Sequence, residues 1–144
     1  MPPVLVQSDR LGELEIPADK LLTFPDGLLG FPDAVQFVMV EVEGSDEYRW
    51  LQSVDDPGLA FLAVIPWAFF PDYSPEIDDA TQVELGVAEP TDAIVLCLIT
   101  IRDDADPPIT ANLLGPLIIS TATRVGRQVV QSDASLPTRA ALGG

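Results

Sequence analysis

The sequence from Leu51 to Tyr73, LQSVDDPGLAFLAVIPWAFFPDY, constrains the fold more strongly than any other part of the chain. Residues 59–70 form a run of twelve without a charged or polar side chain. This run is shorter than the roughly 18–20 residues of a membrane-spanning helix, and a proline interrupts it, so it belongs to the core of a folded domain. Pro57 and Gly58 predict a turn, and Leu59–Ile65 fits a buried strand.

An aromatic segment follows this predicted strand. Pro66 ends the strand, because a proline cannot donate a hydrogen bond to a neighbouring strand. Trp67, Phe69 and Phe70 then crowd together before Pro71. We expect this segment to be a loop or a single turn that folds over one end of the core.

Short strands are predicted along the rest of the chain, from apolar and β-prone segments between turn signals. They cover residues 4–7, 12–16, 21–24, 37–43, 48–53, 93–102, 109–119 and 128–131. At residues 93–102 the segment is almost wholly apolar, which predicts a central strand covered on both faces. Asp78 is expected to cap a short helix that ends near Leu85, before Gly86, with Val83 facing the core. This pattern indicates an all-β fold: a small antiparallel β-barrel or sandwich of short strands with one short helix.

A chain of 144 residues is expected to form one domain. We assign that domain to residues 1–131 and a flexible C-terminal tail to residues 132–144, where no periodicity is visible. The first residues carry no signal-peptide pattern, and no apolar run has transmembrane length. We therefore expect a cytoplasmic protein that does not contact membranes and is monomeric when free.

Charge is the strongest global signal. The chain has 23 acidic and 7 basic residues, a formal net charge of −16, which disfavours direct binding to nucleic acid. Between Arg49 and Arg102 there is no basic residue, whereas the same interval holds nine acidic ones. Such a surface either serves solubility or attracts a basic protein partner, and composition alone leaves both open.

The residues that most enzymes use are scarce. The chain has no histidine, which excludes the commonest general base and most zinc sites, and Cys97 lies in an apolar segment where burial is expected. The acidic loop at residues 103–106 lacks the glycine and distal glutamate of a calcium loop, so we expect no metal and no cofactor. The alternative is a carboxylate-based hydrolase of a small or sugar substrate, which would need two acids converging in a deep cleft.

Four blocks of sequence resemble one known family. They are Thr23–Val40 (TFPDGLLGFPDAVQFVMV), Leu51–Tyr73, Thr110–Ile119 (TANLLGPLII) and Gly126–Val130 (GRQVV). In order and spacing they are similar to the bacterial flagellar assembly factor FliW, and the similarity covers roughly residues 14–131. The resemblance implies a non-enzymatic regulator that binds flagellin before export. Once freed, it binds CsrA, an RNA-binding protein that represses flagellin translation.

Aromatic residues beside prolines, with acidic residues around them, have the composition of a protein interface with apolar anchors and a charged rim. The alternative is that Trp67, Phe69 and Phe70 are simply buried in the core, which we expect of at least two of them. With the resemblance, this gives a candidate contact surface of Asp55, Asp56, Phe69, Phe70, Asp72 and Tyr73. Asn112 and Pro116, in another of the blocks, are expected to shape either an interface or a bulge. Alanine at Asp72 or Tyr73 is expected to weaken partner capture and to leave thermal stability nearly intact.

Overall fold

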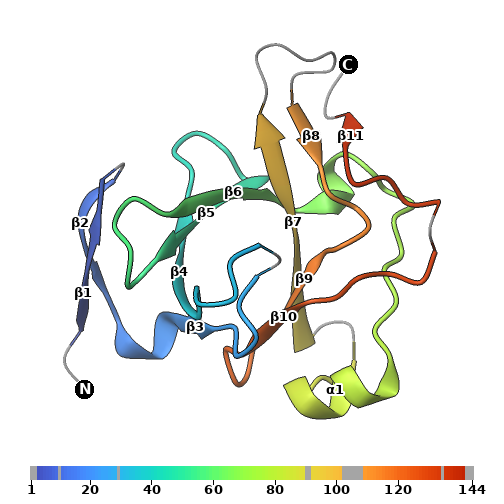
Figure 1. Cartoon of the computed structure of the whole chain (residues 1–144), viewed down its shortest axis with the longest axis horizontal. Coiled ribbons are helices and arrows are strands. Elements are labelled where there is room, and N and C mark those ends of the chain that lie inside the picture. The colour runs from blue at the N-terminus through green and yellow to red at the C-terminus, as the bar shows by residue number, and fades with distance from the viewer. Residues whose placement is uncertain are drawn as a thin grey trace.

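The computed structural model describes residues 3–9, 11–28, 30–89, 92–101, 109–133 and 135–141. Its elements, in chain order, are β1 (Val4–Ser8), β2 (Gly12–Ile16), the 3₁₀ helix η1 (Ala18–Lys20), β3 (Leu21–Thr23), β4 (Gln36–Glu41), β5 (Tyr48–Ser53), β6 (Ala60–Val64), the 3₁₀ helix η2 (Pro66–Ala68), α1 (Asp79–Leu85), β7 (Ala93–Ile101), β8 (Ile109–Ala111), β9 (Leu117–Ser120), β10 (Gly126–Gln128) and β11 (Ala140–Ala141). Most of the described chain is therefore in strands or the turns between them (Figure 1).

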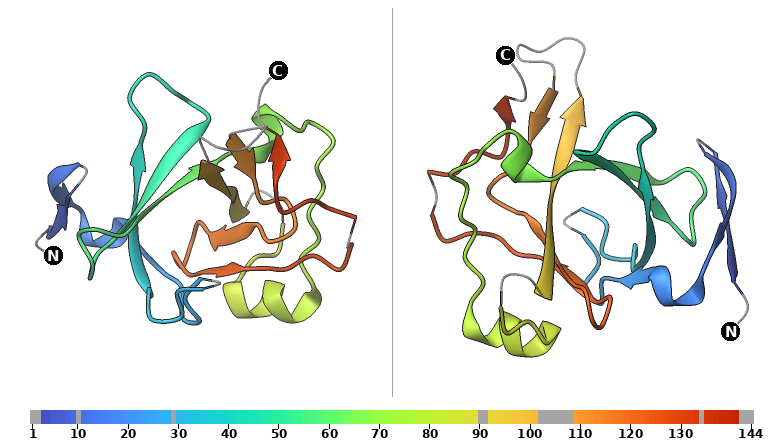
Figure 2. Two further views of the ribbon diagram at one scale, coloured as in Figure 1. Left: turned by 45° about the horizontal axis from the view of Figure 1, so that its top comes forward. Right: turned by 180° about the vertical axis from the view of Figure 1, so that it is seen from behind.

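The main sheet is antiparallel and almost closes into a barrel. Its strands follow the order β10, β9, β7, β6, β5, β4 and β3. The two ends of this series meet where Thr23 pairs with Val125 and the Thr23 amide donates to the carbonyl of Arg124 at 2.9 Å. Strands β1 and β2 form a separate hairpin beside the barrel (Figures 1 and 2). The expectation of a small antiparallel all-β fold with one short helix is confirmed.

Strand β7 connects the parts of the fold. One side of β7 pairs with β6, and the other pairs first with β9 and then with β8. The predicted strand over residues 109–119 is therefore two strands, because the chain turns away from β7 between them. Asn112 forms this turn: its Oδ1 accepts hydrogen bonds from the amides of Leu114 (3.0 Å) and Gly115 (2.9 Å). Pro116 follows and has no amide hydrogen for a sheet.

The core has an inner part and outer parts that lie on the two faces of β7. Leu96 belongs to the barrel interior, whereas the next residue, Cys97, packs outside the barrel with Tyr73. Strand β7 is thus covered on both faces, as its apolar sequence predicts. The interior cluster consists of Leu22, Phe24, Leu28, Phe37, Leu51, Ala63, Leu96, Leu117 and Ile119.

Helix α1 has the predicted boundaries but a different orientation. Asp78 caps it by accepting a hydrogen bond from the Thr81 amide at 2.7 Å, and Gly86 ends it in the left-handed conformation (φ 72°). Thr81 and Leu85 are buried, one helical turn apart. Val83 lies between them in sequence and points the opposite way, with 82% of its side chain exposed, so its expected core position is wrong.

The C-terminal part differs from the expectation in two places. Strand β10 covers residues 126–128 rather than 128–131, because β9, its partner, begins only at Leu117. Ala140–Ala141 pairs with β8, and Ala140 and Leu136 pack on the cluster around Tyr73. These contacts place Leu136, Ala140 and Ala141 against the domain, and the flexibility of the tail stays a prediction. The predicted acidic loop at residues 103–106 lies outside the described residues. In the part of the chain that is described, no helix is long and apolar enough to cross a membrane.

Candidate protein-binding surfaces

The candidate contact residues lie at the two ends of β6. The loop with Asp55 and Asp56 precedes this strand and reaches the β1–β2 hairpin, where the Asp9 amide donates to the Pro57 carbonyl at 2.9 Å. The 3₁₀ helix η2 follows this strand and lies beside β7 (Figures 1 and 2). Five residues of strand at about 3.3 Å each separate the two groups by roughly 16 Å. The expected single contact surface is therefore two separate surfaces.

A buried glutamine shapes the loop of the first surface. The Gln52 side chain is fully buried, and its Oε1 accepts a hydrogen bond from Ser8 Oγ at 2.7 Å. Its Nε2 donates to the backbone carbonyls of Asp56 (3.2 Å) and Leu59 (3.1 Å). The loop is thus tied to both β5 and the N-terminal hairpin, and Asp55 and Asp56 are held exposed. Sequence reasoning missed Gln52, because a glutamine in a strand carries no signal of burial.

A shallow hollow lies beside this loop. Its volume is about 310 Å³, and Asp33, Asp55 and Asp56 are among its lining residues. Phe31, also in the lining, is 42% exposed and lies edge-on against Phe61, with 5.1 Å between the ring centroids. All three aspartates are exposed, so this surface offers carboxylates in water around one aromatic ring.

The second surface is largely buried. Phe69 is half-buried against Tyr48, with ring centroids 6.0 Å apart, and Phe70 is half-buried on the same cluster. Tyr73 is only 7% exposed, and its hydroxyl donates to the Leu113 carbonyl at 2.6 Å. Of the four candidates here, only Asp72 is exposed. The burial of Tyr73 argues against the expectation that its removal leaves stability intact.

Burial also controls the two titratable groups of this cluster. Loss of hydration, followed by the nearby Cys97 thiol, raises the pKa of the Tyr73 hydroxyl. Loss of hydration also raises the pKa of Cys97 to about 12, partly offset by its hydrogen bond with Tyr73. Both groups are therefore neutral near neutral pH, and Cys97 is a core residue rather than a nucleophile.

The remaining candidates, Asn112 and Pro116, belong to the turn between β8 and β9. The Asn112 side chain is occupied by that turn, and Pro116 is buried while its carbonyl accepts from the Val129 amide at 2.9 Å. The geometry gives both residues a role in shaping this turn, which stands in place of the expected bulge. Contact with a partner stays a prediction for them, as it does for the acidic and aromatic candidates.

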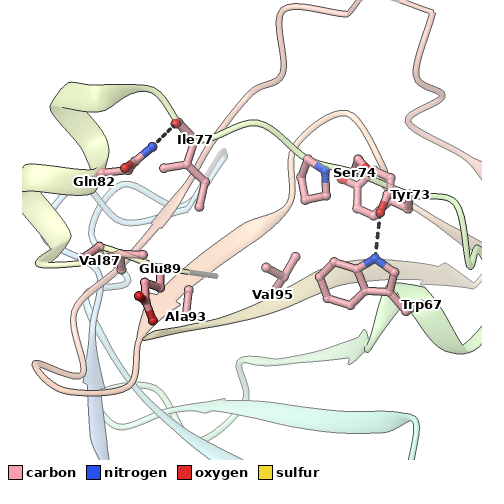
Figure 3. A pocket seen from close by; sticks show the side chains of 11 residues that line it. Trp67, Tyr73, Ser74, Ile77, Gln82, Val87, Glu89, Ala93 and Val95 are labelled. Carbon is pink, nitrogen blue, oxygen red and sulfur yellow. Dashed lines mark hydrogen bonds between the residues drawn. The ribbon is translucent and has the colours of Figure 1, made fainter. Parts of the chain in front are cut away.

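A cleft that the sequence did not reveal lies between η2 and α1, over β7. It has a volume of about 470 Å³. Figure 3 shows Trp67 at one end, Glu89 and Val87 at the other, and Val95 between them. The lining residues are Trp67, Tyr73, Ser74, Pro75, Ile77, Gln82, Val87, Ala88, Glu89, Ala93 and Val95. Glu89 is the one acidic residue among these lining residues. The hydrolase alternative requires two acids that converge in one cleft, and this lining does not provide them.

Comparison with known proteins assigns the chain to a family. A family model described as FliW protein matches residues 5–142. The flagellar assembly factor FliW of Moorella thermoacetica is 37% identical over 134 residues, which are 93% of this chain and 85% of the relative, and that of Natranaerobius thermophilus is 34% identical over 93% and 89%. A crystal structure of the flagellar assembly factor FliW superposes with a TM-score of 0.87 at 29% identity and covers 98% of both chains. The chain therefore belongs to the FliW family of flagellar assembly factors.

Proposed function

We propose that this protein is a non-enzymatic cytoplasmic regulator that binds two proteins in turn. It holds flagellin before export. When flagellin leaves, the freed protein binds CsrA and relieves repression of flagellin translation. Membership of the flagellar assembly factor family supports a role in flagellar assembly, and the two partners are those that the resemblance implies.

The observation that supports a basic partner such as CsrA is the distribution of charge. Residues 50–101 contain no lysine or arginine, and they form both surfaces at the ends of β6. Asp55 and Asp56 are exposed at one end, and Asp72 is exposed at the other. A partner that approaches this side of the molecule meets carboxylates, and a basic protein is attracted by them.

This charge also suggests how RNA is displaced. A protein that binds RNA neutralises phosphates with lysine and arginine, so it is complementary to an acidic surface. An acidic domain docked on that protein repels the phosphates of a messenger even where it does not cover the RNA site. The repulsion acts over a distance set by ionic strength, about 10 Å at 0.1 M salt.

Binding of the purified proteins tests this proposal. The protein is titrated with flagellin and with CsrA from the same organism, at low and at high ionic strength. We expect both to bind, and we expect salt to weaken the affinity for CsrA. Absence of binding to both proteins at low ionic strength would overturn the proposal, and salt-independent binding of CsrA would overturn its electrostatic part.

A further inference from the structure

The cleft between η2 and α1 shares Tyr73 with the second candidate surface and extends from there across β7. We propose that it is a docking surface for an apolar segment of a partner protein that carries a lysine or arginine beside its apolar side chains. This inference rests on the proposed function, since it needs a protein partner. It adds the place where that partner binds and the chemistry that the place selects.

Exposed apolar side chains mark this cleft. Trp67 is 41% exposed at one end. A second hollow, of about 520 Å³, adjoins the other end, shares three lining residues with the cleft, and includes Val83, which is 82% exposed. Val87, which is 5% exposed, and Val95, which is half-buried, line the cleft between η2 and α1. A concave surface with an apolar lining and an exposed tryptophan at one end is typical of a binding site.

The walls of the cleft are already fixed in place. The Trp67 indole Nε1 donates to the Tyr73 carbonyl at 2.7 Å (Figure 3). Tyr73 is in turn anchored by its hydroxyl, which donates to the Leu113 carbonyl. On the opposite wall, Gln82 Nε2 donates to the Ile77 carbonyl at 2.7 Å. The Trp67 and Gln82 donors are thus occupied, and most of the surface left to a ligand is apolar, with the Glu89 carboxylate at one end. A rigid tryptophan in such a setting is a typical anchor point of a protein interface.

Charge selects among the possible occupants. Glu89 lines the cleft and Asp79 lines the adjoining hollow, and no lysine or arginine is among the lining residues of either. A cationic side chain that follows the apolar anchors is therefore complementary to this site. A second copy of the chain is a poor occupant, because two molecules of net charge −16 repel each other. The chain's own residues 135–141 are not available either, since they pack beside β8.

The test compares two charge changes at the cleft with the same changes elsewhere. Val83→Lys and Glu89→Lys alter exposed side chains of the cleft and its adjoining hollow. Leu5→Lys and Glu13→Lys alter exposed side chains on the separate β1–β2 hairpin. All four variants are titrated by calorimetry with flagellin and with CsrA, after thermal unfolding has shown that each one folds.

We expect the cleft variants to raise the Kd for at least one partner about tenfold or more, and the hairpin variants to change it less than threefold. If wild-type protein binds a partner and all four variants weaken that binding equally, or none does, the cleft is not the docking surface. If wild-type protein binds neither partner, the proposed function itself fails. These two failures are distinguishable, because only the first leaves the wild-type titration positive.

Discussion

The hydroxyl of Tyr73 should stabilise the fold, and its removal measures by how much. Tyr73 is 7% exposed, and its hydroxyl donates to the Leu113 carbonyl at 2.6 Å across the outer face of β7 and β8. Phenylalanine keeps the ring but leaves this buried carbonyl without that donor, which costs about 1–3 kcal/mol. For Tyr73→Phe we expect the free energy of unfolding to fall by about 1.5 kcal/mol and the Tm by about 5 °C.

Urea unfolding followed by tryptophan fluorescence and far-UV circular dichroism measures this change. Asp72→Asn is the matched control, because Asp72 is the exposed neighbour of Tyr73. The control should change the unfolding free energy by no more than about 0.5 kcal/mol, as is usual at exposed positions. If Tyr73→Phe unfolds at the same urea concentration as the wild type, the hydrogen bond contributes nothing and the structural role assigned to Tyr73 is refuted.

Three further predictions concern buried or capping groups. Gln52→Leu should lower the free energy of unfolding by about 1–3 kcal/mol in the same urea assay, because part-buried carbonyls of the loop lose their donor and the buried Ser8 hydroxyl loses its acceptor on Gln52. An unchanged midpoint would contradict this role. Asp78→Ala should speed amide hydrogen exchange in α1, because the helix loses its cap. The hydrogen bond from Thr81 lowers the pKa of the Asp78 carboxyl, so the cap is fully present above the ordinary pKa of 3.8 and is lost in stronger acid. In that acid range the exchange rates of wild type and variant should converge. Cys97 should react with a thiol reagent only as fast as the protein unfolds, and rapid labelling of the native protein would contradict its burial. Because burial raises the pKa of the Cys97 thiol from 9.0 to about 12, the contribution of this thiol to the free energy of unfolding should decline as the pH rises through that interval.

Features with a local cause could be predicted from the sequence. The strand β6 ends before Pro66, and η2 is the expected single turn. Helix α1 begins after Asp78 and ends before Gly86, because a carboxylate cap and a glycine act within one turn of the helix ends. The family resemblance rests on four separate blocks of sequence, and the family model, which matches residues 5–142, confirms it.

Features that depend on contacts between distant segments could not be predicted. A helix of seven residues is too short for its periodicity to show which face is buried, so Val83 was placed in the core. The burial of Tyr73 depends on Leu113, forty residues away, and that of Gln52 depends on the β1–β2 hairpin. The cleft could not be predicted from the sequence for the same reason, because it exists only where η2, α1 and β7 come together in the folded chain.

A competition titration tests most directly whether this acidic β domain captures its partners one at a time. The purified protein is saturated with flagellin at low ionic strength and then titrated with CsrA, and the order is reversed in a second titration. We expect each partner to bind the free protein with measurable heat and to bind weakly or not at all once the other is present. Simultaneous binding of both partners, or no binding of either, would contradict the proposed regulatory role.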